Sequence, residues 1–373
     1  MILRMRRIVR VTWTLIAVTG LAALGAVMSL RSAQADQFDH EGRDREGHDG
    51  DRDGDKKYTI AMWGDMPYGA LGKQQYPALL QDVNDAHVEF SVFDGDLKAG
   101  GDGPCTDDNL YTPALGYFAT LERPLVWVPG DNDWTDCWGR YGPGTFAPGA
   151  DDPEERLQHE RDLFASTPFS LGQKKLRLTR QSSAGGAFAI YSENVRWKHG
   201  PVVFLGLNVQ GSNDNYPYAG VDGETRSDAE IARQRAEEVA RKAADIAWLN
   251  EGFAYAKATG ALGVMIVIQA DLNFNNEQHL ADTRSWDAFP AYVNALRDVS
   301  LAFPGQVVLV HGDSHYFKVD QPLNTLAGGV VANFTRVETF GSRNNHWVAA
   351  TIDASNPRVF SFEARIVPAN VDP

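Results

Sequence analysis

Two common catalytic signatures are missing from the sequence. No G-x-S-x-G segment follows a predicted strand, and no G-x-x-x-x-G-K-[ST] segment occurs. The first absence argues against a serine hydrolase with a nucleophile elbow, and the second argues against nucleotide binding by a P-loop. Positive charge is also scarce, because 35 Lys and Arg residues face 49 Asp and Glu residues, which gives a net charge of -14. This charge argues against nucleic acid as a stable partner.

The N-terminal segment has the pattern of an export signal. Several arginines precede an apolar stretch over residues 11–30, and Ala33-Gln34-Ala35 follows as a small-residue cleavage site. We therefore predict a signal peptide over 1–35 and a protein that is secreted or periplasmic. A stretch of about 20 apolar residues can also span a bilayer, so an uncleaved membrane anchor is the alternative. Residues 36–57 are polar and of mixed charge, which predicts a disordered linker before a single domain over 58–373.

Cysteine is rare in this chain. Its two cysteines, Cys105 and Cys137, each stand beside a Thr-Asp pair in a predicted loop. An even number of cysteines in an exported protein favours a disulfide, and such a bridge would stabilise the fold by about 3 kcal/mol. Two buried free thiols are the alternative.

Short apolar runs recur after Tyr58, and each ends abruptly in a polar, Gly-rich turn. Helical patterns separate several of them, most clearly over 227–257 and 286–303. The alternation predicts an α/β sheet whose site lies at the carboxyl ends of the strands. Two further runs near the C-terminus, 347–352 and 359–366, are typical of antiparallel strands joined by a turn. The main runs are Tyr58–Trp63, Phe90–Phe93, Leu125–Val128, Val202–Leu207, Leu262–Ile268 and Val307–Val310.

Acidic and amide side chains follow these runs at one end. A single Asp after a strand is ordinary, because Asp favours turns and helix caps. Several acids at one edge of a sheet would repel one another and raise each other's pKa values unless a cation neutralised them. The pattern therefore predicts a metal site, formed by Asp65, Asp96, Asp131, Gln269, Asp313 and His315.

In order and spacing these residues resemble the calcineurin-like metallophosphoesterases, whose motifs run D-x-H, G-D, G-N-H-D/E, a single His, and G-H-x-H. Three segments are similar to strings of an atypical exported subgroup of that family: Gly64–Tyr68 to G-D-x-P-Y, Pro129–Cys137 to P-G-D-N-D/E-W-T-D-C, and His311–Phe317 to H-G-D-x-H-Y-F. The resemblance extends from Tyr58 to the C-terminal strands. It implies two facing mixed β-sheets flanked by helices, an α/β/β/α sandwich.

The resemblance also implies divalent cations, two of them, with Asp96 bridging. The sequence departs from the family at several ligands. Pro67 and Asn132 stand where the family has histidines, and Gln269 and Asp313 replace imidazoles with oxygen donors. An oxygen-rich set with one imidazole, His315, suits Mn²⁺, Mg²⁺ or Ca²⁺ better than Zn²⁺, and iron stays open.

The implied activity is hydrolysis of a phosphate mono- or diester by a metal-activated water. Asn132, Asp133 and His315 fall on or beside the catalytic positions, and the small phosphorylated substrate would need bound cations to approach so acidic a site. Tyr68 and Lys98 are predicted to contact the substrate; a packed rim tyrosine and a solvated lysine are the alternatives. The second hypothesis is a catalytically weak or inactive module that binds a metal or ligand, which the losses at Pro67 and Asn132 support.

Overall fold

The computed structural model describes residues 57–137, 152–216, 228–274 and 288–371, which all belong to one compact unit. The predicted signal peptide and the predicted linker up to its last residue lie outside the described residues. None of the described helices is both long enough and apolar enough to cross a membrane.

One sheet has five strands in the order β12-β11-β1-β2-β3. The strands β1, β2 and β3 run parallel to one another, β11 runs antiparallel to β1, and β12 runs antiparallel to β11. The two C-terminal strands confirm the antiparallel pair that the sequence predicts. The bounds are β1 Lys57–Trp63, β2 Ser91–Phe93, β3 Leu125–Trp127, β11 Trp347–Asp353 and β12 Phe360–Arg365.

The other sheet has seven strands in the order β4-β5-β6-β7-β8-β10-β9. Its centre, from β6 to β10, is parallel, and its two edges are closed by antiparallel strands. The bounds are β4 Thr179–Arg180, β5 Val195–His199, β6 Val202–Gly206, β7 Gly263–Val267, β8 Gln306–His311, β9 Lys318–Asp320 and β10 Phe334–Glu338.

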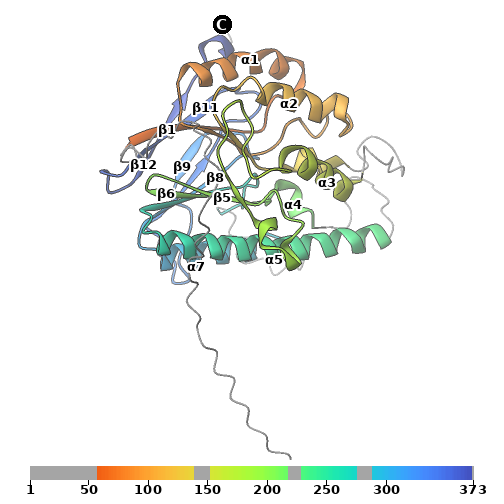
Figure 1. The fold of residues 1–373 in the computed structure, drawn as a ribbon. Helices are drawn as coiled ribbons and strands as arrows, with labels where there is room; N and C mark the ends of the chain where they lie inside the picture. Colours follow the sequence, from red (N-terminus) through yellow and green to blue (C-terminus); the bar gives the residue numbers. More distant parts are fainter. Residues whose placement is uncertain (1–56, 138–151, 217–227, 275–287, 372–373) are drawn as a thin grey trace, which may run out of the picture. The chain divides into compact units, whose positions relative to one another are not determined.

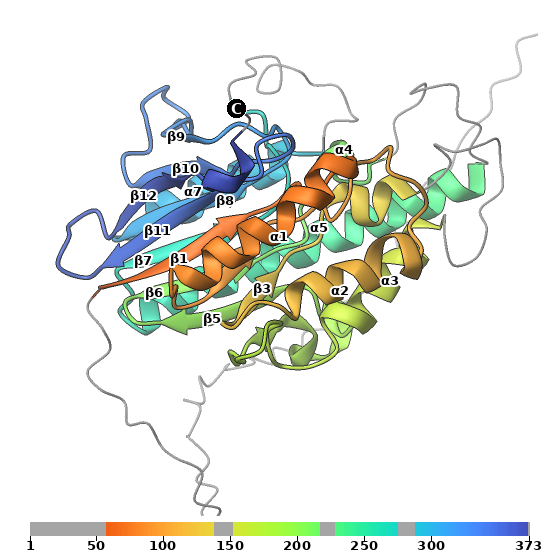
Figure 2. The same ribbon diagram turned by 90° about the horizontal axis from the view of Figure 1, so that it is seen from above.

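The two sheets face each other across an apolar core because side chains alternate along each strand. Ile60 and Met62 of β1 point into this core together with Val308 and Val310 of β8. The intervening side chains point outward, where helices cover them. Figures 1 and 2 show the resulting layers, with helices on the outer faces of both sheets. The predicted fold class, two facing mixed sheets flanked by helices, is therefore confirmed.

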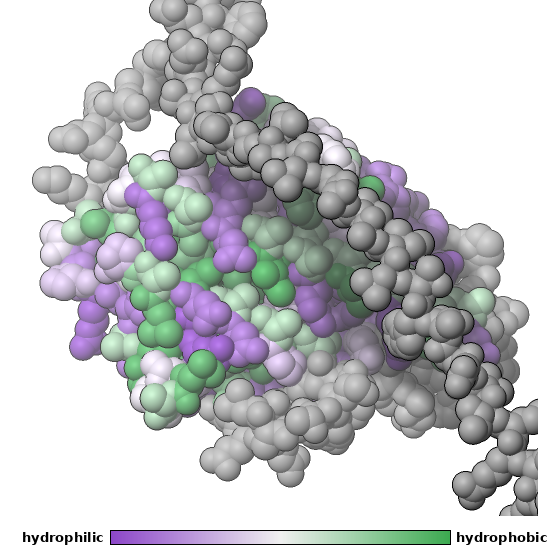
Figure 3. Space-filling view, turned by 90° about the horizontal axis from the view of Figure 1, so that it is seen from below, coloured by the Kyte–Doolittle hydropathy of each residue, from purple (hydrophilic) through white to green (hydrophobic). Residues whose placement is uncertain are grey.

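Separate groups of helices cover the two outer faces. On the five-stranded sheet, α1, α2 and α3 pack against outward residues such as Trp63 and Phe93. On the seven-stranded sheet, α5 and α7 pack against residues such as Leu205 and Leu309. Figure 3 views the molecule from the side on which α5 and α7 lie in Figure 1, and hydrophilic and hydrophobic residues are interspersed over that face. The bounds are α1 Gly69–Asp85, α2 Thr112–Phe118, α3 Pro153–Phe164, α4 Gly211–Asp214, α5 Asp228–Ala258 and α7 Pro290–Ala302.

Short helical turns lie mostly in the connections. They are η1 Asp107–Tyr111, η2 Asp131–Asp133, η3 Thr135–Cys137, η4 Gln181–Ala184, η5 Gly186–Phe188 and η6 Pro368–Asn370. Because β1, β2 and β3 are parallel to one another, as are β6, β7 and β8, each set of carboxyl ends opens on one edge of its sheet. The polar turns that the sequence places after these strands therefore meet at shared edges.

Candidate metal centre

Asp65 links the turns that follow β1 and β8. Its Oδ2 accepts a hydrogen bond of 2.9 Å from the backbone N–H of Asp313. Its Oδ1 lies 3.3 Å from Nε2 of His315. The fold thus brings together residues that are 248 positions apart in the sequence, as the predicted site requires.

Asp96, which follows β2, receives hydrogen bonds from two neighbouring turns. The Tyr68 hydroxyl donates to Asp96 Oδ2 at 2.7 Å and lies 3.3 Å from Asp65 Oδ1. The Asn132 side-chain amide donates to Asp96 Oδ2 at 2.5 Å, and its backbone N–H donates to Oδ1 at 3.0 Å. Tyr68 and Asn132, expected at the substrate side and at the leaving group, therefore both contact the carboxylate predicted to bridge two metal ions.

Asp131 and Asp313 approach each other over the backbone of Gly211. A Cβ at that glycine would lie 2.6 Å from Asp131 Oδ2 and 2.8 Å from Asp313 Oδ1. Any larger residue would push into both carboxylates, so Gly211 leaves the space in which they meet. A further strand end, after β6, thereby belongs to the site, and sequence reasoning had not placed it there.

Several of these residues adopt the left-handed backbone conformation. Their φ angles are 51° at Asp65, 65° at Asp96, 72° at Asp313 and 69° at His315. Residues with a Cβ adopt such angles infrequently, and strained conformations of this kind gather at functional sites. The strained backbone lies at the residues whose side chains converge here, which supports a functional site over ordinary turn-forming aspartates.

His315 is oriented by a loop that sequence reasoning missed. Its Nδ1 lies 2.8 Å from the carbonyl oxygen of Ser342, and the Ser342 N–H donates to the Asp65 carbonyl at 3.0 Å. An Nδ1–H that donates to this carbonyl leaves Nε2 facing Asp65, the orientation that a ligating imidazole needs. No cluster of motif residues marks this loop in the sequence.

Burial and mutual repulsion shift the protonation of the carboxylates. Burial first, and then Asp131 and Asp65, raise the pKa of Asp96 well above its usual range. Burial and the neighbouring Asp65 raise the pKa of Asp313 to about 7. Such acids bind protons at neutral pH unless a stronger cation displaces them.

The donor chemistry of this group fits a hard divalent cation. Asp65, Asp96, Asp131 and Asp313 offer carboxylate oxygens and His315 offers one imidazole nitrogen, a set that suits Mn²⁺, Mg²⁺ or Ca²⁺. No three His, Cys, Asp or Glu side chains within the described parts of the chain are arranged as ready ligands. The oxygens are instead directed at the N–H and O–H donors given above. Binding a cation therefore requires Asp65 and Asp96 to exchange hydrogen bonds for the ion.

Gln269, the sixth predicted ligand, packs against the backbone of Gly95 next to the site. A Cβ added at Gly95 would come within 2.6 Å of the Gln269 Cγ. Its Oε1 accepts a hydrogen bond of 2.5 Å from the Gly211 N–H, whereas its buried Nε2 has no partner among the described residues. Its carbonyl oxygen is thus directed at the backbone. A metal-binding role for Gln269 stays a prediction.

Two further predicted site residues, Asp133 and Lys98, are buried. Asp133, predicted to lie at a catalytic position, is fully buried and accepts N–H bonds from Asp96, Leu97 and Gly130. Burial, opposed by these bonds, raises its pKa to about 6. Its oxygens hold two loops together and are not free to reach a leaving group, so Asp133 is a positioning residue.

Lys98, predicted to contact the substrate, with a solvated lysine as the alternative, is not solvated. Its side chain is buried with 1% exposure, and its Nζ donates to the carbonyl of Ala99. Burial lowers its pKa, which the nearby Asp133 and Asp96 oppose. Lys98 therefore places a positive charge near Asp133 and Asp96, and its contact with a substrate stays a prediction.

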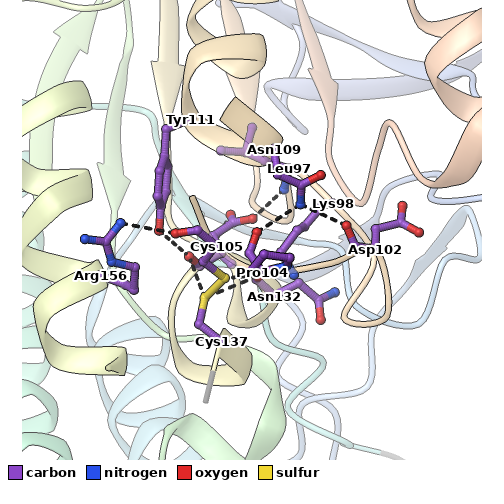
Figure 4. Close-up of a disulfide and its surroundings, with 12 residues drawn as sticks. Leu97, Lys98, Asp102, Pro104, Cys105, Asn109, Tyr111, Asn132, Cys137 and Arg156 are labelled. Carbon is purple, nitrogen blue, oxygen red and sulfur yellow. Dashed lines mark hydrogen bonds between the residues drawn. A yellow bond between two sulfur atoms is a disulfide. The ribbon is translucent and has the colours of Figure 1, made fainter. Parts of the chain in front are cut away.

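The predicted disulfide is present and joins the loops that follow β2 and β3. Cys105 and Cys137 are bonded, with their Cα atoms 5.7 Å apart (Figure 4). The carbonyl of Asp133 accepts a hydrogen bond from the Tyr111 hydroxyl, and Arg156 donates to the carbonyl of Cys105. The bridge thus ties the turn that carries Asn132 to the loop after β2. Disulfides are typical of oxidising compartments.

Asp94 is a further member of the site that sequence reasoning did not single out. It is fully buried beside Asp65; Thr339 donates to its Oδ2 at 2.9 Å, and its Oδ1 has no partner among the described residues. Burial, with Asp65 and Glu338 adding repulsion, raises its pKa well above the usual range. The D-G-D spacing with Asp96 was a signal that could have drawn attention to it.

Comparison with known proteins gives only remote matches. No family model matches the chain, and no curated protein matches it. GAP50 of Plasmodium, described as the anchor in the inner membrane complex, is similar over 83% of this chain and 89% of its own, at 11% identity and a TM-score of 0.39. A 5'-nucleotidase of Candida albicans is similar over 82% of this chain at 10% identity and a TM-score of 0.39.

A sulfate thiohydrolase, SoxB, of Thermus thermophilus is similar over 84% of this chain at 12% identity and a TM-score of 0.40. The chain spans 50% of the nucleotidase and 57% of SoxB. Likenesses this distant carry no argument about function.

Proposed function

We propose that this chain is an exported, metal-dependent phosphoesterase that hydrolyses a phosphate mono- or diester with a metal-activated water. The observation that carries the proposal is the convergence of Asp65, Asp96, Asp131 and Asp313 at one place, several of them strained and with raised pKa values. So many acids are difficult to explain by fold stability alone, because each adds repulsion. A site that binds divalent cations accounts for them.

When bound, divalent cations would supply a nucleophilic water and stabilise charge on the phosphoryl oxygens. Asp65, Asp96, Asp131, Asp313 and His315 would hold them, in number two by the resemblance, with Mn²⁺, Mg²⁺ or Ca²⁺ favoured. The carboxylates formally neutralise two such ions, so Lewis acidity should be weaker than with imidazole ligands. Good leaving groups should therefore react best.

The residues around the carboxylates position the substrate and handle its protons. Asn132 and Tyr68 both reach Asp96, so either side chain can donate a hydrogen bond to a phosphoryl oxygen near it. Burial and then Asp96 raise the pKa of Tyr68 well above its usual range, which keeps its hydroxyl protonated. Tyr68 is thus the proton donor that best replaces the missing histidine at Asn132.

Hydrolysis of p-nitrophenyl phosphate and of its bis-ester, with Mn²⁺, Mg²⁺, Ca²⁺ or Zn²⁺ added, tests this proposal. Asp96→Asn should lower turnover by at least about a hundredfold, because the predicted bridging ligand is lost. Asp85→Asn, an exposed change at the end of α1, is the matched control and should leave turnover unchanged. Absence of metal-dependent turnover of either ester would overturn the proposal.

The alternative is a metal- or ligand-binding module with the same fold and little catalysis. Pro67 and Asn132 favour it, as do the hydrogen bonds that occupy Asp65 and Asp96. This alternative predicts saturable cation binding without turnover of either ester. The two readouts together therefore separate the hypotheses.

Export is part of the proposal and has its own test. The Cys105–Cys137 disulfide supports an oxidising compartment outside the cytosol. Mass measurement of the exported protein should show an N-terminus after residue 35. A protein that keeps residues 1–35 and stays in the membrane would favour the uncleaved anchor.

A further inference from the structure

Two exposed residues near His315 in the fold are not used by the proposed chemistry. Tyr316, the next residue along the chain, has 70% of its surface exposed, while its backbone N–H donates to Glu338. Arg343 is exposed in the loop whose Ser342 carbonyl contacts His315. One exposed residue thus follows His315 in the chain, and the other follows Ser342, whose carbonyl contacts His315.

The loop that carries Arg343 is packed tightly against the site. A Cβ at Gly341 would lie 2.6 Å from the His315 ring and 2.7 Å from Cβ of Asp65. The backbone of Asn344 turns back to Gly341 with a hydrogen bond of 2.8 Å. Arg343 therefore extends from a short, closed turn whose base touches two predicted ligands.

The positively charged side chains of neighbouring elements already have hydrogen-bond or ion-pair partners. Lys98 is buried against a carbonyl, Lys318 is paired with Glu338, and Arg336 is paired with Asp320. In contrast, Arg343 has no hydrogen-bond or ion-pair partner for its guanidinium among the described residues. Acids outnumber bases 49 to 35 in this chain, yet Arg343, one position after the Ser342 that contacts His315, is not neutralised by an acid among the described residues.

We propose that Arg343 and Tyr316 form a subsite for the organic part of the substrate, which carries a flat ring and a second negative charge. A guanidinium recognises carboxylate or phosphate with paired N–H donors, and an exposed tyrosine ring offers a stacking face. The reacting phosphoryl group would lie at the carboxylates. The anionic leaving group would extend over His315 toward the turn at Gly341.

This inference rests on the proposed phosphoesterase function and names the substrate class of the same site. It predicts an aromatic phosphoester with an additional carboxylate or phosphate. Simple alkyl esters should be poorer substrates, because neither Arg343 nor Tyr316 would contact them.

Phosphate release from 4-carboxyphenyl phosphate and from phenyl phosphate, with the Mn²⁺-loaded protein, tests the subsite. Arg343→Gln should raise KM for the carboxylated ester about tenfold more than for phenyl phosphate, as expected for one charge-assisted contact. Arg343→Lys should recover part of this difference, and the effect should weaken as salt increases. Tyr316→Ala should raise KM for both aromatic esters, whereas Tyr316→Phe should not.

Arg358→Gln is the matched control, because Arg358 is exposed on the turn between β11 and β12, at the strand ends farthest from the site. It should leave the ratio of the two substrates unchanged. Equal losses for both esters in Arg343→Gln, or the same change in Arg358→Gln, would overturn the subsite.

Binding separates failure of the subsite from failure of the hydrolytic function. If the wild-type protein hydrolyses neither ester, calorimetry with Mn²⁺-loaded protein and 4-carboxyphenylphosphonate against phenylphosphonate gives the same comparison. A preference of about tenfold for the carboxylated phosphonate, lost in Arg343→Gln, would support the subsite while the hydrolytic proposal fails. Equal affinities, or no binding of either, would refute it.

Discussion

Removing the charge of Asp313 should stabilise the metal-free protein at alkaline pH. Burial and Asp65 raise the pKa of Asp313 from 3.8 to about 7. A raised pKa in the folded state means that stability is fully present below the unfolded value and is lost as pH rises through the folded value. The loss should therefore occur between about pH 4 and pH 7.

The size of the effect follows from this shift. A difference of about 3 pKa units corresponds to about 4 kcal/mol, and the partly exposed surface of Asp313 reduces the expected value to about 2 kcal/mol. Asp313→Asn keeps an oxygen that can accept the Asp271 N–H, so the change removes charge while preserving this contact. In chelator at pH 8, the variant should unfold at a higher denaturant concentration than the wild type.

Asp271, whose backbone N–H donates a hydrogen bond to Asp313, is the matched control, because its pKa is shifted in the opposite direction. Burial opposes its ionisation, yet His311, Ser314 and the Asn273 N–H together lower its pKa. Its contribution is present above the unfolded pKa and disappears as pH falls through the folded one. Asp271→Asn should therefore destabilise the metal-free protein at pH 8, by about 1 kcal/mol, and have less effect near pH 4.

Urea unfolding from pH 4 to pH 8, in chelator and in excess Mn²⁺, measures these effects. The stabilisation by Asp313→Asn should grow with pH in chelator and reverse in Mn²⁺, because the wild type then gains the binding energy of the ion. A variant that is less stable than the wild type at pH 8 in chelator would refute the charge-crowding argument.

Further changes test the loops around Asp96. Replacing Cys105 and Cys137 with serine should lower the free energy of unfolding by about 3–4 kcal/mol, as loop entropy predicts for a separation of 32 residues. Denaturant titration measures this loss, and a clearly smaller loss would contradict the estimate. Asn132→His should raise turnover of alkyl phosphates by about tenfold or more if the metal centre works, and unchanged rates would favour the binding module. Tyr68→Phe should slow alkyl esters more than nitrophenyl esters by about tenfold, and equal effects would exclude Tyr68 as proton donor.

Much of the fold was predictable because its strands are short, apolar and end in distinctive turns. The run Val202–Leu207 becomes β6 at Val202–Gly206, and Leu262–Ile268 becomes β7 at Gly263–Val267. The helical pattern over 227–257 becomes α5, Asp228–Ala258. The edge strands β4 and β9 have two and three residues, too few for their periodicity to be recognised in the sequence.

The candidate site was predictable only in part. Acids after parallel strands must meet at one edge, so the convergence of Asp65 and Asp96 follows from topology. The direction in which each side chain points does not follow from the topology. Asp133 and Lys98 stand in motif loops like their neighbours, but backbone N–H groups capture the first and burial removes the second from the surface. The Ser342 loop contacts His315 through backbone atoms, which no residue pattern records.

The central claim is that the carboxylates after the strands bind a hard divalent cation. Equilibrium dialysis against Mn²⁺ followed by elemental analysis tests it directly, on the wild type, Asp96→Asn and the exposed control Asp85→Asn. The account predicts saturable binding of about two equivalents in the wild type and the control, with a large loss in Asp96→Asn. No saturable binding in the wild type, or equal binding in Asp96→Asn, would contradict it.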